Sequence, residues 1–240
     1  MVGCMLIHGF TGAPYEVEPL AGYLKEHTDW RISVPTLPGH GDGETLHGVT
    51  SEEWIETAEA KLIQLLEACD TVYLVGFSMG GVLAGYLATK YKVDKLVLLS
   101  AAYKYIHPFQ MMKDIAHMVI DTSKGKLVQN ELFVRYRKKM KVTPFQASLQ
   151  FRKLVRQLRP SFQQVTVPTL ILQGKLDSMV PYKTAHTIYQ TIGSVDKQMY
   201  VMDCSRHLIC HGDDQGDVIQ KVYQFLINGT DQSHHTLAPS

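Results

Sequence analysis

A serine set between glycines stands where a strand-like run gives way to a helix-like run. The apolar run covers residues 71–75, the turn reads Gly-Phe-Ser-Met-Gly-Gly at 76–81, and the helical pattern covers 82–88. A sharp strand-to-helix turn has cramped backbone geometry, and the glycines two residues either side of the serine remove Cβ atoms that would collide. Such a turn holds the Ser78 hydroxyl out at the carboxyl end of a sheet, near the positive end of the next helix. The alternative is a glycine-rich turn that contains a serine by chance.

Two later residues provide the groups that an active serine needs. A serine hydroxyl is a poor nucleophile near neutral pH unless a base lies within hydrogen-bond reach, and the base needs a carboxylate to fix its tautomer. Asp177 follows the apolar run 167–172, and His207 follows the run 198–202. We therefore expect Ser78, Asp177 and His207 to form a catalytic triad. Asp203 is the rival acid, but it lies only four residues before His207, a poor position for reaching the far ring nitrogen.

The N-terminal run contributes a candidate oxyanion hole. Residues 1–7 form an apolar strand pattern, and His-Gly-Phe-Thr-Gly follows at 8–12. A tetrahedral intermediate needs donors aimed at its oxyanion, and backbone N–H groups are already fixed in place. We expect the N–H groups of Phe10 and Met79 to serve, Met79 being the residue after the nucleophile. The alternative for residues 8–12 is an ordinary glycine turn.

Together these segments resemble the α/β hydrolases, and most of all the small bacterial carboxylesterases and monoglyceride-lipase-like esterases. The resemblance lies in five segments along nearly the whole chain: 6–12, Leu-Pro-Gly-His-Gly at 37–41, the serine turn, Gly-x-x-Asp-x-x-Val-Pro at 174–181, and His207. It implies an α/β-hydrolase fold with a mostly parallel sheet of about six strands, flanking helices and a helical cap. One departure is Arg206, because a glycine commonly precedes the histidine in that family.

Apolar runs alternate with helical patterns, which predicts a parallel sheet. Strands are expected near 3–7, 31–35, 71–75, 95–99, 168–173 and 197–202. Helical spacing is clear at 16–27 and 214–227. Thr-Ser-Glu-Glu at 50–53 has the pattern of a capping box that opens a helix running to about residue 68.

The alternation stops between residues 103 and 160, which predicts a helical cap inserted into the core. The core is then 1–102 and 161–229, and residues 230–240 form a polar tail. Methionine and phenylalanine suit an adaptable acyl-binding surface, so Phe109 and Met112, with Val180 of the core, are the candidate substrate contacts. The alternative is that the apolar cap residues only hold the cap to the core.

Charge is divided unevenly along the chain. The whole chain has 24 basic and 23 acidic residues, so it has no general attraction to nucleic acid. The segment 103–160, however, has thirteen Lys or Arg against three Asp or Glu, a net charge of +10. One interpretation is a solvated face partly docked on acids of the core such as Glu52 and Glu59. The other is attraction of an anionic substrate or a weak association with anionic lipid.

Other features argue against metals, cofactors and secretion. His211 follows His207 by four residues, but two histidines without matching acids are a weak metal pattern, so we expect no metal and no cofactor. His40 precedes the nucleophile in a loop that the resemblance assigns to structure. The four cysteines include no C-x-x-C pair, and the short apolar start lacks a basic leader. We therefore expect reduced thiols and a cytoplasmic protein.

The resulting prediction is a serine hydrolase that cleaves small-molecule carboxylic esters of short to medium acyl chain, monoacylglycerols included, through an acyl-enzyme on Ser78. A thioesterase, a perhydrolase or a lyase on the same fold is the alternative. Against the lyase stands Val82, where that family usually has arginine. A non-catalytic binding protein is the third hypothesis. The acyl chain, the alcohol and the oligomeric state stay open.

Overall fold

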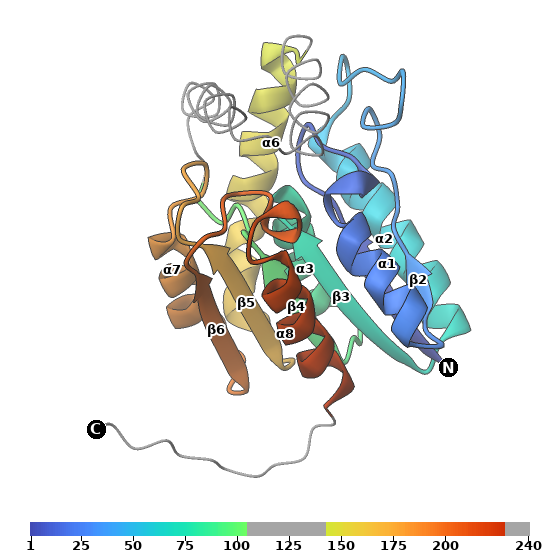
Figure 1. Ribbon diagram of the computed structural model, residues 1–240. Helices are drawn as coiled ribbons and strands as arrows, with labels where there is room; N and C mark the ends of the chain where they lie inside the picture. The colour runs from blue at the N-terminus through green and yellow to red at the C-terminus, as the bar shows by residue number, and fades with distance from the viewer. Residues whose placement is uncertain (105–142, 229–240) are drawn as a thin grey trace.

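Six parallel strands form one sheet in the computed structural model, which describes residues 1–104 and 143–228 (Figure 1). The order across the sheet is β2-β1-β3-β4-β5-β6. Their bounds are Val2–Ile7 for β1, Arg31–Ser33 for β2, Thr71–Phe77 for β3, Lys95–Leu99 for β4, Thr169–Gly174 for β5 and Lys197–Met202 for β6. All five neighbouring pairs are parallel. The predicted α/β fold is confirmed.

The helices follow the strands as the alternating pattern predicts. Their bounds are Glu18–His27 for α1, Ser51–Ala68 for α2, Met79–Lys90 for α3, Phe145–Leu158 for α6, Lys183–Thr191 for α7 and Gln215–Ile227 for α8. The capping box of α2 is present: Thr50 N–H donates to Glu53 Oε2 at 2.8 Å, and Glu53 N–H donates to Thr50 Oγ1 at 3.3 Å. The helix expected from residue 16 instead starts with the 3-10 helix Pro14–Glu16, and α1 follows with a proline in its first turn.

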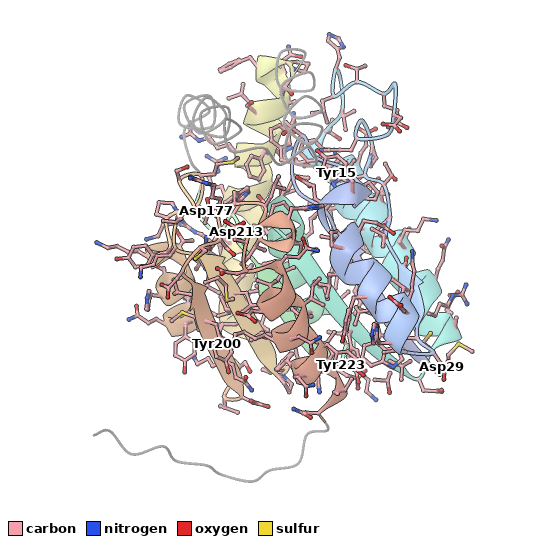
Figure 2. The ribbon with its side chains drawn as sticks, in the orientation of Figure 1. Tyr15, Asp29, Asp177, Tyr200, Asp213 and Tyr223 are labelled. Atoms are coloured by element: carbon pink, nitrogen blue, oxygen red, sulfur yellow. The ribbon has the colours of Figure 1, made fainter. Side chains whose placement is uncertain are left out.

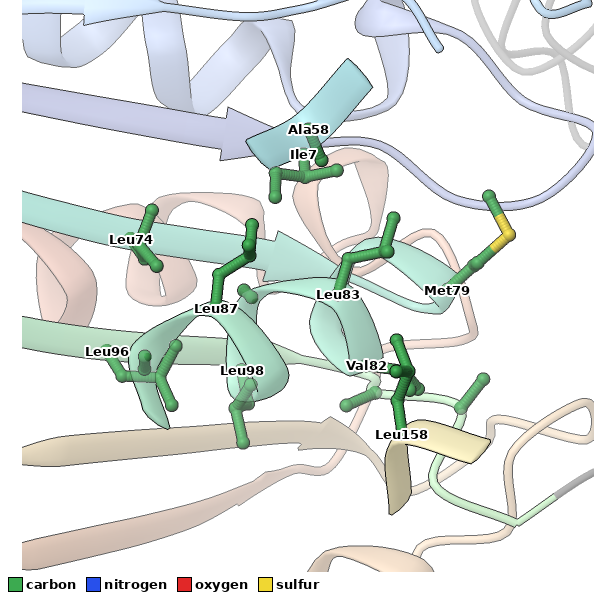
Figure 3. Packing of buried hydrophobic residues seen from close by; sticks show 14 of the residues in the cluster. Ile7, Ala58, Leu74, Met79, Val82, Leu83, Leu87, Leu96, Leu98 and Leu158 are labelled. Carbon is green, nitrogen blue, oxygen red and sulfur yellow. The ribbon is translucent and has the colours of Figure 1, made fainter. Parts of the chain in front are cut away.

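Successive residues of each strand pack into two separate cores, one on each face of the sheet. Val97 and Leu99 of β4 belong to the core shared with α1 and α8, whereas Leu96 and Leu98 belong to the core shared with α2, α3 and α6. Figure 3 shows part of the second core around α3, and its labelled residues include Leu74, Leu83, Leu87, Leu96, Leu98 and Leu158. Because both faces are covered, the central strands are apolar at nearly every position.

A buried lysine at the start of β4 interrupts that apolar pattern. Lys95 Nζ donates to the carbonyl oxygens of Phe225 at 2.8 Å and Leu226 at 3.0 Å, and also to that of Asn228. These carbonyls end α8, where no further helical N–H groups can reach them. Burial lowers the pKa of Lys95, but its hydrogen bonds cap α8 against the sheet.

The strand order reverses between β1 and β3, because β2 lies on one side of β1 and β3 on the other. In open α/β sheets, ligands bind outside the carboxyl ends of the strands at such a reversal. The loop after β1 and the turn after β3 both leave the sheet at this point. The topology therefore brings residues 8–12 and Ser78 together at one edge.

The predicted cap lies mostly outside the described residues, as do Phe109, Met112 and the tail at 230–240. Its described part includes α6, which extends past the carboxyl ends of the strands (Figure 1). Lys153 of α6 forms an ion pair with Glu52 at 2.7 Å, and Gln150 accepts the Ser51 N–H at 3.2 Å. Glu59 instead pairs with Lys90 of α3. One basic residue of the segment 103–160, Lys153, is thus docked on an acid of the core. The division of the chain into core and cap stays a prediction.

The four cysteines are free thiols, as expected. Burial raises the pKa of the Cys210 thiol to about 12 and raises that of Cys4 further. Both buried thiols are therefore protonated at neutral pH. In the part of the chain that the structure describes, no helix is both long enough and apolar enough to span a bilayer.

Candidate active site

Ser78 occupies the strained turn that its glycine neighbours predict. Its φ is 53° and its ψ is −114°, a region that non-glycine residues rarely adopt. Such a conformation costs on the order of 1–3 kcal/mol and persists only where the surroundings impose it. Here Ser78 N–H donates to Leu99 O at 2.9 Å, and Ser78 O accepts from Gly81 N–H at 3.1 Å and Ala102 N–H at 3.0 Å. The end of β4 and the start of α3 hold the serine in place.

Glycines allow the turn to pack against itself and against β1. A Cβ at Gly76 would lie 2.3 Å from the carbonyl oxygen of Gly80. A Cβ at Gly80 would lie 2.1 Å from the carbonyl oxygen of Ile7 and 2.6 Å from that of His8. All three contacts are with backbone atoms, which cannot rotate away. The glycines thus set the distance between Ser78 and the loop after β1.

Ser78, His207 and Asp177 form a continuous hydrogen-bonded chain. His207 Nε2 lies 3.0 Å from Ser78 Oγ, and His207 Nδ1 lies 2.8 Å from Asp177 Oδ2. An ionised carboxylate only accepts hydrogen bonds, so Nδ1 carries the proton and Nε2 is left to accept the serine hydroxyl. The three residues are 8 %, 3 % and 5 % exposed, respectively. Figure 2 shows Asp177 beyond the carboxyl ends of the strands. The structure thus brings all three predicted triad residues together.

The Asp177 carboxylate receives four donors. Its Oδ1 accepts the N–H groups of Met179 at 2.9 Å and Val180 at 2.8 Å. Its Oδ2 accepts Gln173 Nε2 at 2.8 Å as well as His207. Val180, a predicted substrate contact, is buried in the core shared with α2, α3 and α6, and its backbone N–H donates to the acid. Its contact with an acyl chain stays a prediction.

The rival acid lies elsewhere. Asp203 is exposed and forms an ion pair with Lys175 at 2.7 Å. The loop that carries His207 is held instead by Asp214, whose Oδ2 accepts Cys204 N–H at 2.8 Å and Ser205 Oγ–H at 3.1 Å. The acid that reaches His207 in the structure is Asp177.

The loop after β1 contains the first predicted oxyanion donor, the N–H of Phe10. Gly9 N–H donates to the buried Glu16 at 2.7 Å, and Thr11 N–H donates to His40 Nε2 at 3.2 Å. Between them, Phe10 N–H has no hydrogen-bond partner among the described residues. Met79 is the first residue of α3, so its N–H has no acceptor within the helix. These are the two N–H groups predicted to form the oxyanion hole: one lies in the loop after β1 and the other directly follows Ser78.

Two buried histidines brace this loop. His8 Nδ1–H donates to Gly9 O at 2.9 Å, and His8 Nε2 accepts Leu37 N–H at 3.1 Å. His40 Nδ1–H donates to Pro38 O at 2.9 Å while its Nε2 accepts from Thr11. Both rings therefore carry the proton on Nδ1 and join the loop after β1 to the loop at 37–40. The structural role expected of His40 matches these contacts.

His211 contacts the backbone at Tyr15. Its Nε2–H donates to Tyr15 O at 2.8 Å, and burial lowers its pKa. Among residues 1–104 and 143–228, no cluster of three or more His, Cys, Asp or Glu side chains is arranged to hold a metal ion.

Sequence reasoning missed Glu16 and Gln173, which contact the loop after β1 and the acid respectively. Gln173 had a signal, because it is a polar residue inside an apolar strand pattern that is buried on both faces. Glu16 had none, since it was consistent with the exposed side of a helix.

The chain is similar to known ester hydrolases. The family model described as "Serine aminopeptidase, S33" matches residues 3–214. A thermostable monoacylglycerol lipase of Bacillus sp. (strain H-257) is 29 % identical over 231 residues, which cover 94 % of this chain and 90 % of that protein. A carboxylesterase of Bacillus subtilis (strain 168) is 25 % identical over 224 residues, covering 92 % and 91 %.

Solved structures share the fold. One comes from a study of LipS and LipT, two metagenome-derived lipolytic enzymes; it has a TM-score of 0.76 at 22 % identity and covers 94 % of this chain and 93 % of its own. The Paleococcus ferrophilus monoacylglycerol lipase has a TM-score of 0.72 at 16 % identity, covering 93 % of each chain. At these identities the likeness concerns the fold alone.

Proposed function

We propose that this chain, which belongs to the serine aminopeptidase S33 family of α/β hydrolases, cleaves carboxylic esters of short to medium acyl chain through an acyl-enzyme on Ser78. Monoacylglycerols are among the proposed substrates, because the relatives include a monoacylglycerol lipase and a carboxylesterase over nearly their whole lengths. The chain is an ester hydrolase of the esterase and lipase kind. The triad mechanism and the acyl range are our proposals.

Acylation starts with the hydrogen bond between Ser78 Oγ and His207 Nε2, 3.0 Å long. His207 takes the hydroxyl proton as Ser78 Oγ attacks the ester carbonyl carbon, and Asp177 stabilises the imidazolium through Nδ1–H. The carbonyl oxygen becomes an oxyanion, which the N–H groups of Phe10 and Met79 would bind. Collapse of this intermediate breaks the bond to the alcohol, which leaves with the proton from His207.

Deacylation uses the same groups again. With the alcohol gone, His207 is neutral and takes a proton from a water molecule that attacks the acyl carbon. The second tetrahedral intermediate collapses to the free acid, and His207 returns the proton to Ser78 Oγ. One observation carries this proposal: the hydrogen bonds that link Ser78, His207 and Asp177, whose donor directions the carboxylate sets.

Apolar residues around the site support an acyl substrate. The Phe10 ring stacks on Phe151 of α6 with centroids 4.9 Å apart and meets Trp54 of α2 edge-on at 5.7 Å. The backbone N–H of Phe10 can thus serve the oxyanion while its ring lies in the apolar layer between α2 and α6. That layer adjoins the serine turn, because Met79 belongs to the same core.

A panel of substrates tests the proposal. p-Nitrophenyl esters from C2 to C12, mono- and triacylglycerols, an acyl thioester and an amino-acid p-nitroanilide should be compared on the purified chain, with Ser78→Ala as the control. We expect turnover of short and medium esters and of monoacylglycerols, and a loss of roughly 10³-fold or more in Ser78→Ala. Faster cleavage of the thioester or the anilide than of the matched ester would contradict the proposal.

The basic segment 103–160 has two interpretations that salt can separate. The Lys153–Glu52 pair supports docking onto the core. Attraction of anionic esters or anionic lipid would weaken as salt rises, since exposed charges are screened over about 8 Å at physiological ionic strength. A rate on anionic esters that falls with salt, beside a constant rate on neutral p-nitrophenyl butyrate, would favour attraction. If the rates on anionic and neutral esters depend equally on salt, only the docking interpretation remains.

A further inference from the structure

We infer that Gln173 is a positioning residue for the proposed reaction: its side-chain amide fixes the Asp177 carboxylate and limits the basicity of His207. The inference rests on the proposed role of the triad. Gln173 is 1 % exposed and is the fifth residue of β5, between β4 and β6. Its Nε2 lies 2.8 Å from Asp177 Oδ2 and 3.0 Å from Val180 O.

The surroundings fix the orientation of this amide. Both neighbours of Nε2 are acceptors, a carboxylate oxygen and a carbonyl oxygen. The flipped amide would place its own oxygen against both of them and lose two hydrogen bonds in a buried place. One proton of the Gln173 NH₂ group is therefore directed at Asp177 Oδ2 and the other at Val180 O, at the two ends of the loop segment 177–180.

The second effect is electrostatic, because Gln173 and His207 share the same oxygen. Asp177 Oδ2 accepts from Gln173 Nε2 and from His207 Nδ1, each at 2.8 Å. When His207 is neutral, Asp177 bears an uncompensated charge, and the amide dipole stabilises it. When His207 is protonated, the same dipole points its positive end toward a cation. The Gln173 amide thus favours neutral His207, the form that accepts the Ser78 proton.

Removing the amide should shift the pH profile of activity in one direction, whereas loss of a purely structural contact should not shift it. In Gln173→Met the shape is nearly kept but both donors are lost. The acid limb of the pH profile of kcat/KM reports the essential base of the free enzyme. We expect that limb to move to higher pH by about 0.5–1 unit. We also expect kcat to fall by roughly 10-fold with KM nearly unchanged, because Gln173 does not reach the ester.

A matched control lies on the same strand. Thr169 begins β5 at its far end, is fully buried, and donates its hydroxyl to Val167 O at 2.8 Å. Thr169→Val keeps the shape and removes one buried hydrogen bond away from the acid. It should lower the melting temperature without moving the acid limb. Other ionisable groups on the loops nearby are the same in both variants: Glu16, Lys175, Asp203, Arg206 and Asp214.

The experiment measures kcat/KM for p-nitrophenyl butyrate from pH 4.5 to 9 in the wild type and both variants, with melting curves for each. An acid limb raised in Gln173→Met but not in Thr169→Val supports the inference. A limb that is unchanged or lowered in folded Gln173→Met overturns it. Should Gln173→Met not fold, Gln173→Leu carries the test: it also lacks both donors, so its limb must rise, and a wild-type profile overturns the inference.

The proposed function is checked separately in the same preparations. A fluorophosphonate should label Ser78 in the wild type whatever the outcome at position 173. Unlabelled wild-type protein would refute the triad mechanism, whereas labelled wild type with an unshifted Gln173→Met profile would refute only the role of Gln173.

Discussion

Replacing Gly80 by alanine tests how the serine turn sets the geometry of the site. The new Cβ would lie 2.1 Å from Ile7 O and 2.6 Å from His8 O, whereas real Cβ contacts stay above 3.0 Å. Strand β1 and helix α3 must therefore separate by roughly 1 Å, because backbone atoms close the space on both sides. The loop after β1 would move away from Ser78 by a similar amount.

This displacement should lower both the stability of the fold and the reaction rate. Overpacking at a rigid contact costs about 3 kcal/mol, and alanine returns about 1 kcal/mol of helix propensity. A net loss of about 2 kcal/mol in a chain of this size lowers the melting temperature by roughly 4–8 °C. Misplacing catalytic groups by about 1 Å reduces the rate by on the order of 10²-fold.

Gly22→Ala is the matched control, because Gly22 is also in a helix and nothing lies within 4 Å of its added Cβ. It should raise the melting temperature by about 2–4 °C and leave activity unchanged. Calorimetry and p-nitrophenyl butyrate hydrolysis measure both effects. Wild-type melting and activity in Gly80→Ala would refute the reasoning, because the contact with β1 would then be dispensable.

Three further predictions concern other contacts. Asp177→Asn should lower kcat by on the order of 10³–10⁴-fold and Asp203→Asn by less than about 3-fold, measured on the same ester; the reverse order would mean that the acid is wrong. Lys95→Met removes the charged cap of α8 and should cost about 1–2 kcal/mol in chemical denaturation; an unchanged midpoint would contradict it. The pKa of His211 is lowered in the fold, so the stability tied to neutral His211 is present above about pH 6.5 and lost as the pH falls below it. Between pH 7 and 5 the melting temperature of His211→Gln should therefore fall less than that of the wild type, and an equal fall would count against it.

Local patterns were sufficient to predict the sheet, because its strands are buried on both faces and their runs stand out from the amphipathic helices. Residues 95–99 are apolar after Lys95, and the structure has β4 at those positions. Some strand ends differ from the predicted ones where the apolar pattern is less clear. Strand β3 continues to Phe77, since Gly76 and Phe77 still pair with Leu98 and Leu99 of β4.

The hydrogen-bonded arrangement of Ser78, His207 and Asp177 could be predicted for a related reason. Each of its residues follows a strand, and the carboxyl ends of parallel strands meet at one edge. The supporting contacts could not, because they are made by side chains that look ordinary in the sequence. Glu16 holds Gly9 N–H from an adjoining turn, and His40 accepts Thr11 N–H from a loop 29 residues away. Only the folded arrangement shows that these polar groups are buried and paired.

The most direct test of the central claim is covalent labelling of the nucleophile. The purified chain should be treated with a fluorophosphonate, digested, and analysed by mass spectrometry, with Ser78→Ala and His207→Ala in parallel. The proposed mechanism predicts one adduct per chain, on the peptide that carries Ser78, no adduct in Ser78→Ala, and strongly slowed labelling in His207→Ala. An adduct on another serine, or ester turnover that survives in Ser78→Ala, would contradict it.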